Sequence, residues 1–255
     1  MTKTGTIISE YASQSGHWYD KDGKPAYTII GANGKERPTT LRDARKLDLR
    51  PSVTTILQLA YKGGLENWKQ EQTILACLTM PRIENEPEAD YIARLKADSK
   101  AQAQKAAARG TEIHGYVEAG FRRDVGEKFE PEEGLKYYNS ARDTLFVETG
   151  RVFFSIEKSF ATDRFGGKVD LHDADFLIDI KTTEKDVADL KTWDDHAMQL
   201  AAYDFGLGNP GRKCGILYIN YKAESRLIWL EPKELEKGWK MFCALLNFWY
   251  AKNDL

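Results

Sequence analysis

The chain has 255 residues, of which 42% are hydrophobic and 30% charged, and its formal net charge is −2. This composition is typical of a folded protein with one large domain, and it excludes a disordered chain and a globally basic nucleic-acid-binding protein. Any nucleic-acid site must therefore be a local patch. The cysteines Cys77, Cys214 and Cys243 lack CxxC spacing, which argues against a zinc ribbon, an iron–sulfur cluster or a disulfide framework.

The sequence also gives no sign of a membrane segment. No apolar run approaches the roughly 18 residues that span a bilayer, and the first residues, MTKTGTIISEY, lack the core of a signal peptide. We therefore expect a cytoplasmic protein that has no membrane partner.

The first forty residues predict irregular β-structure. WYDKDGKPAYTII alternates apolar positions around the turn pair Asp22-Gly23, and GANGK supplies a second turn. In LRPSVTTIL, Ser52 is placed to cap a short helix. LENWKQEQTILACLTM then repeats apolar residues at helical spacing, which predicts an amphipathic helix that ends at Pro81.

The middle of the chain predicts three helices. Residues 86–110 are alanine-rich, with an acidic front and a basic back. TEIHGYVEAGF is expected to form a separate helix, whose start at Gly110-Thr111 would leave backbone N–H groups free for a phosphate. Residues 131–149 form the third.

After Gly150 the pattern changes to β-structure. RVFFSIEKSFAT, GGKVDLHD and FLIDIKTT predict three strands, and TWDDHAMQLAAYDFGLG predicts a helix with Thr192 as its cap. KCGILYINY and SRLIWL predict two more strands, and residues 232–252 a last helix. This order predicts an α/β fold, with a mixed sheet packed against helices.

The stretch FGGKVDLHDADFLIDIKTT places two carboxylates and an ammonium in a buried hairpin. Facing residues of antiparallel strands lie about 5 Å apart, so Asp170 and Asp179 repel each other unless a cation binds between them. Asp179 and Lys181 project from one face, with Ile180 opposite. Such oxygen ligands suit Mg²⁺ or Mn²⁺, and the ammonium can orient a water. The alternative is a solvated hairpin with a surface ion pair, which the apolar flanks disfavour.

Two helical pairs accompany this hairpin. His114 and Glu118 lie four residues apart in TEIHGYVEAG, and Gln199 and Tyr203 lie four apart in QLAAY. Residues at this spacing share one face of a helix. Each pair, taken alone, fits an ordinary helix surface.

In chain order, GTEIH, GGKVD, DIK and QLAAY resemble the motif series of the PD-(D/E)XK nuclease superfamily, specifically its RecB-like exonuclease branch. The resemblance is specific over residues 107–203. It extends more loosely to RPSVTTIL, which is similar to an element of phage exonucleases and of the mitochondrial genome maintenance exonuclease. It implies a restriction-endonuclease-like core over residues 107–255, with residues 1–106 as a β-hairpin and helical region of the same globule that guides the substrate.

The resemblance also implies roles for individual residues. Asp170, Asp179, His114 and the backbone of Ile180 would bind Mg²⁺ or Mn²⁺, and Lys181 would assist the hydrolytic water. Gln199 and Tyr203 would orient the substrate strand or support the site, while Glu157 and Glu118 stay open between a ligand and a supporting role. Gly166-Gly167 would leave room for a phosphate backbone beside Asp170. The residues expected to contact DNA are Lys100, Lys105, Arg109, Thr111, Gly167 and Thr182.

The implied function is a Mg²⁺- or Mn²⁺-dependent DNA exonuclease that prefers single-stranded ends. We expect it to act in phage or bacterial recombination or DNA processing, with a recombination or single-strand-binding protein as a possible partner. The chain has no GxxxxGK[ST] phosphate loop, so duplex opening would need another protein. Two alternatives remain: a structure-specific endonuclease on the same core, and a nucleic-acid-binding module without catalysis.

Overall fold

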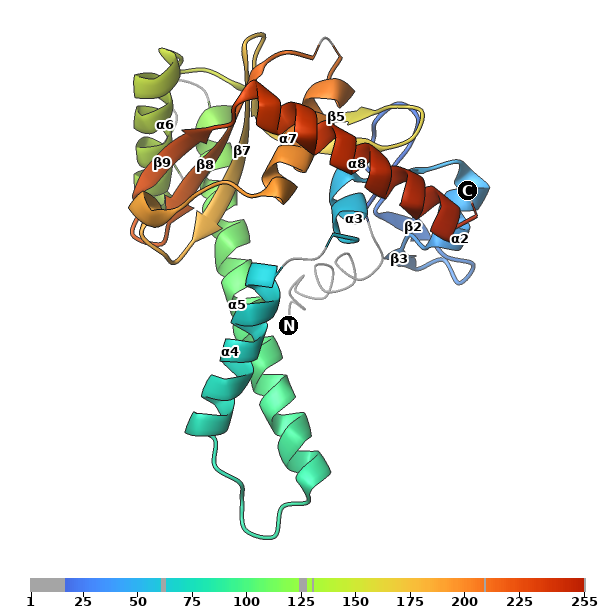
Figure 1. Cartoon of the computed structure of the whole chain (residues 1–255), viewed down its shortest axis with the longest axis vertical. Helices are drawn as coiled ribbons and strands as arrows, with labels where there is room; N and C mark the ends of the chain where they lie inside the picture. Colours follow the sequence, from blue (N-terminus) through green and yellow to red (C-terminus); the bar gives the residue numbers. More distant parts are fainter. Residues whose placement is uncertain (1–16, 61–62, 124–127, 130, 209, 255) are drawn as a thin grey trace.

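The structure, a computed structural model, describes residues 17–60, 63–123, 128–129, 131–208 and 210–254. Its centre is a mixed five-stranded sheet in which the strands lie in chain order, β5-β6-β7-β8-β9 (Figure 1). Only β7 and β8 are parallel, and the helix α7 connects them. The predicted α/β class with a central mixed sheet is confirmed. The strands are Ser155–Ala161 (β5), Gly166–His172 (β6), Phe176–Thr183 (β7), Lys213–Asn220 (β8) and Ser225–Trp229 (β9).

Helices cover both faces of the sheet, because its central strands carry apolar residues on both sides. Leu177 and Ile216 belong to a core formed with α3, α7 and α8, whereas Ile178, Ile180 and Leu217 belong to a core formed with α5 and α6. The bounds are Val53–Leu57 (α3), Glu88–Arg122 (α5), Leu135–Thr149 (α6), Asp194–Gly206 (α7) and Pro232–Lys252 (α8), with short 3₁₀ turns at Glu132–Gly134 and Val187–Asp189.

A helical hairpin, which we call the arm, projects from this body (Figure 1). It consists of α4 (Gly63–Thr79) and the first half of α5. The amphipathic pattern of α4 predicts a buried apolar face, but Ile74 is 59% and Leu78 76% exposed, so that face has no cover within the described residues. The other half of α5 returns into the body and packs against β7.

The predicted break between two helices at Gly110 is wrong, because α5 runs unbroken through 35 residues, about 50 Å at 1.5 Å per residue. The predicted region boundary at residues 106–107 therefore falls inside one helix. Gly110 allows α5 to approach β7 closely, because a Cβ at this position would lie 2.6 Å from Thr182 Oγ1 of β7. The backbone N–H groups of Gly110 and Thr111 lie in the interior of α5 and not at a helix start, so the phosphate site predicted there is not formed.

The N-terminal region forms short β-structure as predicted. Its turns pass through Gly23 and Gly34, both at positive φ, and Ser52 Oγ accepts from Thr55 N (2.9 Å) to cap α3. Trp18 packs edge-on against Trp249 of α8, which joins this region to the core. The elements are β1 (Trp18–Tyr19) paired with β4 (Arg50–Pro51), β2 (Thr28–Ile30) paired with β3 (Glu36–Pro38), and α2 (Leu41–Leu47).

No helix in the described ranges combines the length and apolar character needed to cross a bilayer.

Candidate functional site

The candidate site forms where β6 and β7 separate. Their pairing ends at Leu171↔Ile178, one position before Asp170 and Asp179 would face each other. Asp170 Oδ2 accepts a hydrogen bond from the backbone N–H of Ile180 instead (2.8 Å). The parting of the strands leaves two carboxylates beside a gap in the ladder.

Asp179 is buried at 2% exposure and is held by neighbours from two elements. Lys181 Nζ lies 2.7 Å from Asp179 Oδ2, as expected for residues on one face of a strand. Gln199 Nε2 of α7 donates to Asp179 Oδ1 (2.8 Å), and Gln199 Oε1 accepts from Lys181 (3.1 Å). Gln199 Nε2 also lies 3.1 Å from the hydroxyl of Tyr203. The structure therefore links the strand motif and the helix motif through one amide.

Asp170 is held from the other side by α5. His114 Nε2 lies 3.1 Å from Asp170 Oδ2, and His114 Nδ1 lies 2.7 Å from Glu118 Oε1. The imidazole therefore bridges two carboxylates. Because Gly110 lets α5 approach β7, one turn later His114 reaches Asp170.

The electrostatics differ between the two acids. Burial raises the pKa of Asp179 to about 6, with Lys181 opposing and Asp170 adding to the rise. Burial also acts on Asp170, but the hydrogen bond and charge of His114 outweigh it and lower the pKa of Asp170. For His114 burial is again outweighed, here by Asp170 and Glu118, which raise its pKa to about 10. Burial and the charge of Asp179 raise the pKa of Tyr203, so its phenol stays protonated.

In the described part of the chain, no three His, Cys, Asp or Glu side chains form a ready-made metal cluster. The donor types nonetheless fit a hard divalent cation, since Asp170 and Asp179 offer carboxylate oxygens, and His114 would offer an imidazole nitrogen once a cation displaced its extra proton. Asp179 Oδ2 is buried and accepts no aligned hydrogen bond, although Lys181 Nζ lies close to it. A cation bound at this oxygen would share it with the ammonium of Lys181.

Glu157 lies at the margin of this group of contacts, where its carboxyl group contacts that of Glu118. Its carboxylate binds Arg122 (2.9 Å) and Lys168, and its backbone is at φ 49°, a left-handed conformation that is rare for a non-glycine residue in a strand. The pairing of β5 with β6 keeps one register on both sides of Glu157, so this residue faces Asp170 across the ladder. The structure thus places Glu157 beside the site, bound to cations of the chain.

The predicted phosphate space at Gly166-Gly167 is absent. A Cβ on Gly167 would lie 2.8 Å from the ring of Phe160 and 2.9 Å from that of Tyr203, and one on Gly166 would meet Tyr19 at 2.7 Å. Both glycines are buried under aromatic rings of the chain itself. Their lack of side chains serves packing, and the prediction of open space there is wrong.

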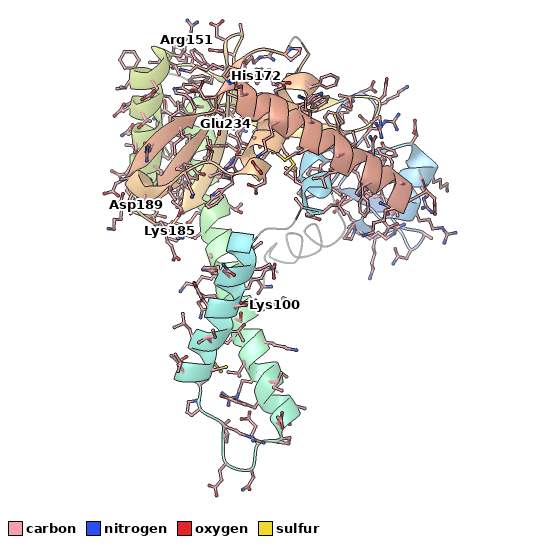
Figure 2. All side chains as sticks on the ribbon, viewed as in Figure 1. Lys100, Arg151, His172, Lys185, Asp189 and Glu234 are labelled. Atoms are coloured by element: carbon pink, nitrogen blue, oxygen red, sulfur yellow. The ribbon has the colours of Figure 1, made fainter. Side chains whose placement is uncertain are left out.

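The other predicted DNA contacts divide into two groups. Lys100 and Lys105 are exposed on the arm, where Figure 2 labels Lys100. Arg109 is engaged within the body, because it binds Glu112 and donates to the hydroxyl of Tyr137 (2.6 Å). Thr111 is exposed and donates to Ala107 O (3.1 Å), within the helix. Thr182 faces Gly110 of α5.

Sequence reasoning missed the loop before α7. The cap of that helix is Trp193, not the predicted Thr192. The indole of Trp193 is exposed, and Lys191 Nζ lies 4.5 Å from the centre of its ring. The signal was present as a lysine and a tryptophan two residues apart, just upstream of QLAAY.

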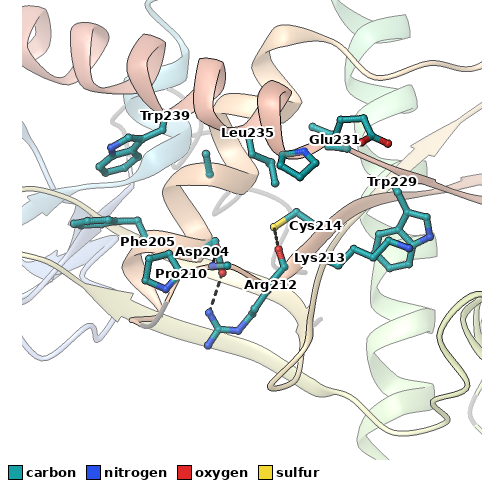
Figure 3. A pocket seen from close by; sticks show the side chains of 14 residues that line it. Asp204, Phe205, Pro210, Arg212, Lys213, Cys214, Trp229, Glu231, Leu235 and Trp239 are labelled. Carbon is teal, nitrogen blue, oxygen red and sulfur yellow. Dashed lines mark hydrogen bonds and ion pairs between the residues drawn. The ribbon is translucent and has the colours of Figure 1, made fainter.

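A separate cavity of ≈ 580 Å³ lies at the opposite end of the sheet, around the start of β8 (Figure 3). Its walls include Phe205 and Trp239, and its floor holds the Asp204–Arg212 ion pair (2.9 Å). None of the predicted site residues lines it.

Comparisons with known proteins give low similarity. No family model and no curated protein matches the chain. Among solved structures, it is similar to an alkaline exonuclease (LHK-Exo) from Laribacter hongkongensis, with 14% identity and a TM-score of 0.38 over 74% of this chain and 94% of that one. A protein named SSO0001 is similar at 16% identity and a TM-score of 0.28, over 72% and 87%. Neither likeness is high enough to assign an activity to this chain.

Proposed function

We propose that the protein is a metal-dependent DNA exonuclease that hydrolyses phosphodiester bonds from single-stranded ends. The observation that carries the proposal is the convergence on one face of β7: Asp179, Lys181 and Gln199 are joined by direct contacts, and Asp170 lies beside them. A structural ion pair would not require an amide from a second element to fix both its members. The sequence motifs that resemble the PD-(D/E)XK series supply these same residues.

Asp170, Asp179, the carbonyl of Ile180 and His114 would hold Mg²⁺ or Mn²⁺. The bound cation would polarise the scissile phosphate and lower the pKa of a water. Lys181 reaches toward solvent, with its side chain 33% exposed, and its ammonium would orient that water and bind a phosphate oxygen. Gln199 holds Lys181 and Asp179 in register, and Tyr203 supports Gln199.

We propose that the arm binds the substrate. Lys96, Lys100 and Lys105 are exposed along α5, which leads from the tip of the arm to His114. Lysines along one helix bind phosphates without sequence preference and in a salt-dependent way. Because the sequence has no helicase motif, we propose a single-stranded end as the substrate, in phage or bacterial recombination or DNA processing. A recombination or single-strand-binding protein would supply that end.

The test is digestion of 5′- and 3′-labelled single- and double-stranded oligonucleotides with Mg²⁺ or Mn²⁺. Asp179→Asn keeps the shape and removes one charge, so it should abolish cleavage and retain binding. Asp143→Asn is the matched control, because Asp143 lies exposed on α6 and should leave cleavage unchanged. Normal turnover by Asp179→Asn would refute the assignment.

The same assay separates the alternatives. Cleavage of circular single-stranded DNA would identify an endonuclease on this core. A protein that binds labelled single strands but leaves them intact with either metal would be a binding module.

A further inference from the structure

Of the six tryptophans, all within the described ranges, Trp193 alone is mainly exposed, at 59%. Trp18 and Trp249 are buried, and Trp229 and Trp239 pack against the cores. A large indole left in solvent costs hydrophobic free energy that the fold does not recover at this position. A single exposed aromatic is ordinary on a protein surface, so its surroundings decide whether it serves a ligand.

The surroundings hold Trp193 in place. Its backbone N–H donates to His196 Nδ1 (3.2 Å), and its carbonyl accepts from His196 N (3.0 Å). The preceding loop is fastened to the sheet, because Arg226 donates to Ala188 O (2.6 Å) and Tyr218 donates to Lys191 O (3.0 Å). Because the backbone at Trp193 is fixed in this way, only the side-chain torsions of Trp193 lose freedom when a ligand stacks on the ring.

The loop also lies at the edge of the candidate site. Tyr218 of β8 is the register partner of Lys181, so the hydroxyl that holds Lys191 belongs to the neighbour of the site lysine. Trp193 is the N-cap of α7 and lies six residues before Gln199. Figure 2 shows Lys185 and Asp189 of this loop at the end of the sheet where the arm leaves the body.

The pairing with Lys191 suggests the class of ligand. Lys191 Nζ lies 4.5 Å from the centre of the Trp193 ring, so a π-face and an ammonium are presented together. A nucleotide carries both complements, a base that stacks on the indole and a phosphate that binds the ammonium. Stacking of this kind tolerates any base, because every base has a π-face.

We propose that Trp193 is a stacking platform for a base of the nucleic-acid strand held at Asp179 and Lys181, and that Lys191 binds the adjoining phosphate. Lys191 occupies one face of the indole, and the base stacks on the other. The inference rests on the proposed function and adds to it a subsite for a base that flanks the scissile bond.

The experiment measures binding in the Asp179→Asn background, where cleavage does not interfere. Fluorescence anisotropy with a labelled single-stranded 12-mer is compared with a series of 12-mers that each lack one base at successive positions. Trp193→Ala should weaken binding of the intact strand about tenfold, the loss of one base–aromatic stack. Against the strand that lacks the stacked base, Trp193→Ala should have no effect, and Trp193→Phe should restore most of the affinity for the intact strand.

The control is Phe153→Ala, which removes an aromatic ring that is 73% exposed at the opposite end of the sheet. Unchanged urea midpoints show that the variants fold.

Equal affinity of Trp193→Ala and its parent for the intact strand, with cleavage by the wild-type protein normal, would overturn this inference alone. An equal loss for every member of the series would also overturn it, since the effect would not depend on a base. If the wild-type protein neither binds nor cleaves DNA, the proposed function fails and this inference fails with it.

Discussion

Gln199, on α7, donates a hydrogen bond to Asp179 of β7, with its amide nitrogen 2.8 Å from the carboxylate oxygen Oδ1. The same amide accepts from Lys181 through its oxygen, so one side chain positions both the buried Asp179 and the partly exposed Lys181. This relationship makes Gln199 a positioning residue whose removal should affect folding and turnover together.

Gln199→Leu keeps the volume and removes the hydrogen bonds of the amide to Asp179, Lys181 and Tyr203. It should lower the free energy of unfolding by about 1–3 kcal/mol, because a buried carboxylate oxygen loses its donor. Cleavage should fall as well, since Lys181 is no longer held. Urea unfolding and the oligonucleotide assay measure the two effects. Gln102→Leu, on the exposed surface of α5, is the control and should stay within about 0.5 kcal/mol of the parent. If the unfolding curve of Gln199→Leu matched that of the wild-type protein, the hydrogen bonds of the Gln199 amide would not contribute to stability.

Periodicity was sufficient to predict much of this site. The alternation of a strand places Asp179 and Lys181 on one face, and the helical repeat places Gln199 beside Tyr203; their contacts confirm both. The roles of the glycines were not predictable in this way. The sequence predicts a helix start at Gly110 and an open turn at Gly167. In the structure each glycine makes room for a side chain that is not adjacent in the sequence, and no local pattern indicates such a contact.

Gly110→Ala should misplace α5 relative to β7. The added Cβ would lie 2.6 Å from Thr182 Oγ1, and overpacking of this size costs about 1–3 kcal/mol. Because His114 follows on the same helix, the shift should also lower cleavage. Urea unfolding and the nuclease assay measure both effects.

A second substitution tests the cause. Thr182→Ala removes the oxygen and leaves its Cβ 3.8 Å from the new methyl group, an ordinary contact. Gly110→Ala combined with Thr182→Ala should therefore recover most of the stability that Gly110→Ala loses. If the double variant is as unstable as the single one, a contact of the added methyl group other than that with Thr182 causes the loss, because alanine itself favours a helix over glycine.

His17 predicts a pH dependence outside the candidate site. Its ring stacks on Tyr27 with centroids 4.4 Å apart, and burial, followed by the charge of Lys168, lowers the pKa of His17 below its ordinary 6.5. Just below pH 6.5, His17 therefore binds a proton in the unfolded chain but stays neutral in the folded protein. The stability contributed by neutral His17 is present above pH 6.5 and is lost as the pH falls below it.

His17→Phe keeps a ring for Tyr27 and cannot titrate. Between pH 7.5 and 5.5 the wild-type protein should lose more unfolding free energy than this variant, as measured by urea unfolding in the presence of a chelator. His172, whose pKa burial also lowers, contributes equally to both proteins. Parallel pH profiles would mean that His17 is solvated in the folded state.

The three cysteines report on the fold through their thiol reactivity. Cys77 is exposed on α4, whereas Cys214 lies at 0% exposure in β8 and its thiol donates to Arg212 O (3.3 Å). Burial raises the pKa of the Cys214 thiol, and the charge of Asp204 adds to this rise, so the reactive thiolate is suppressed. Burial also raises the pKa of Cys243, which is half-buried in α8.

Labelling of the native protein with a maleimide should modify Cys77 first, Cys243 more slowly and Cys214 only after unfolding in urea, with each site assigned by peptide mass. Cys77→Ser should remove the fast phase and leave the slow ones unchanged. Rapid labelling of Cys214 in the native protein would contradict its 0% exposure, and would mean that the cavity at the start of β8, which Cys214 lines, opens to the reagent. Protection of Cys214 that is lost at the urea midpoint of global unfolding would instead show that the sheet opens only when the whole core does.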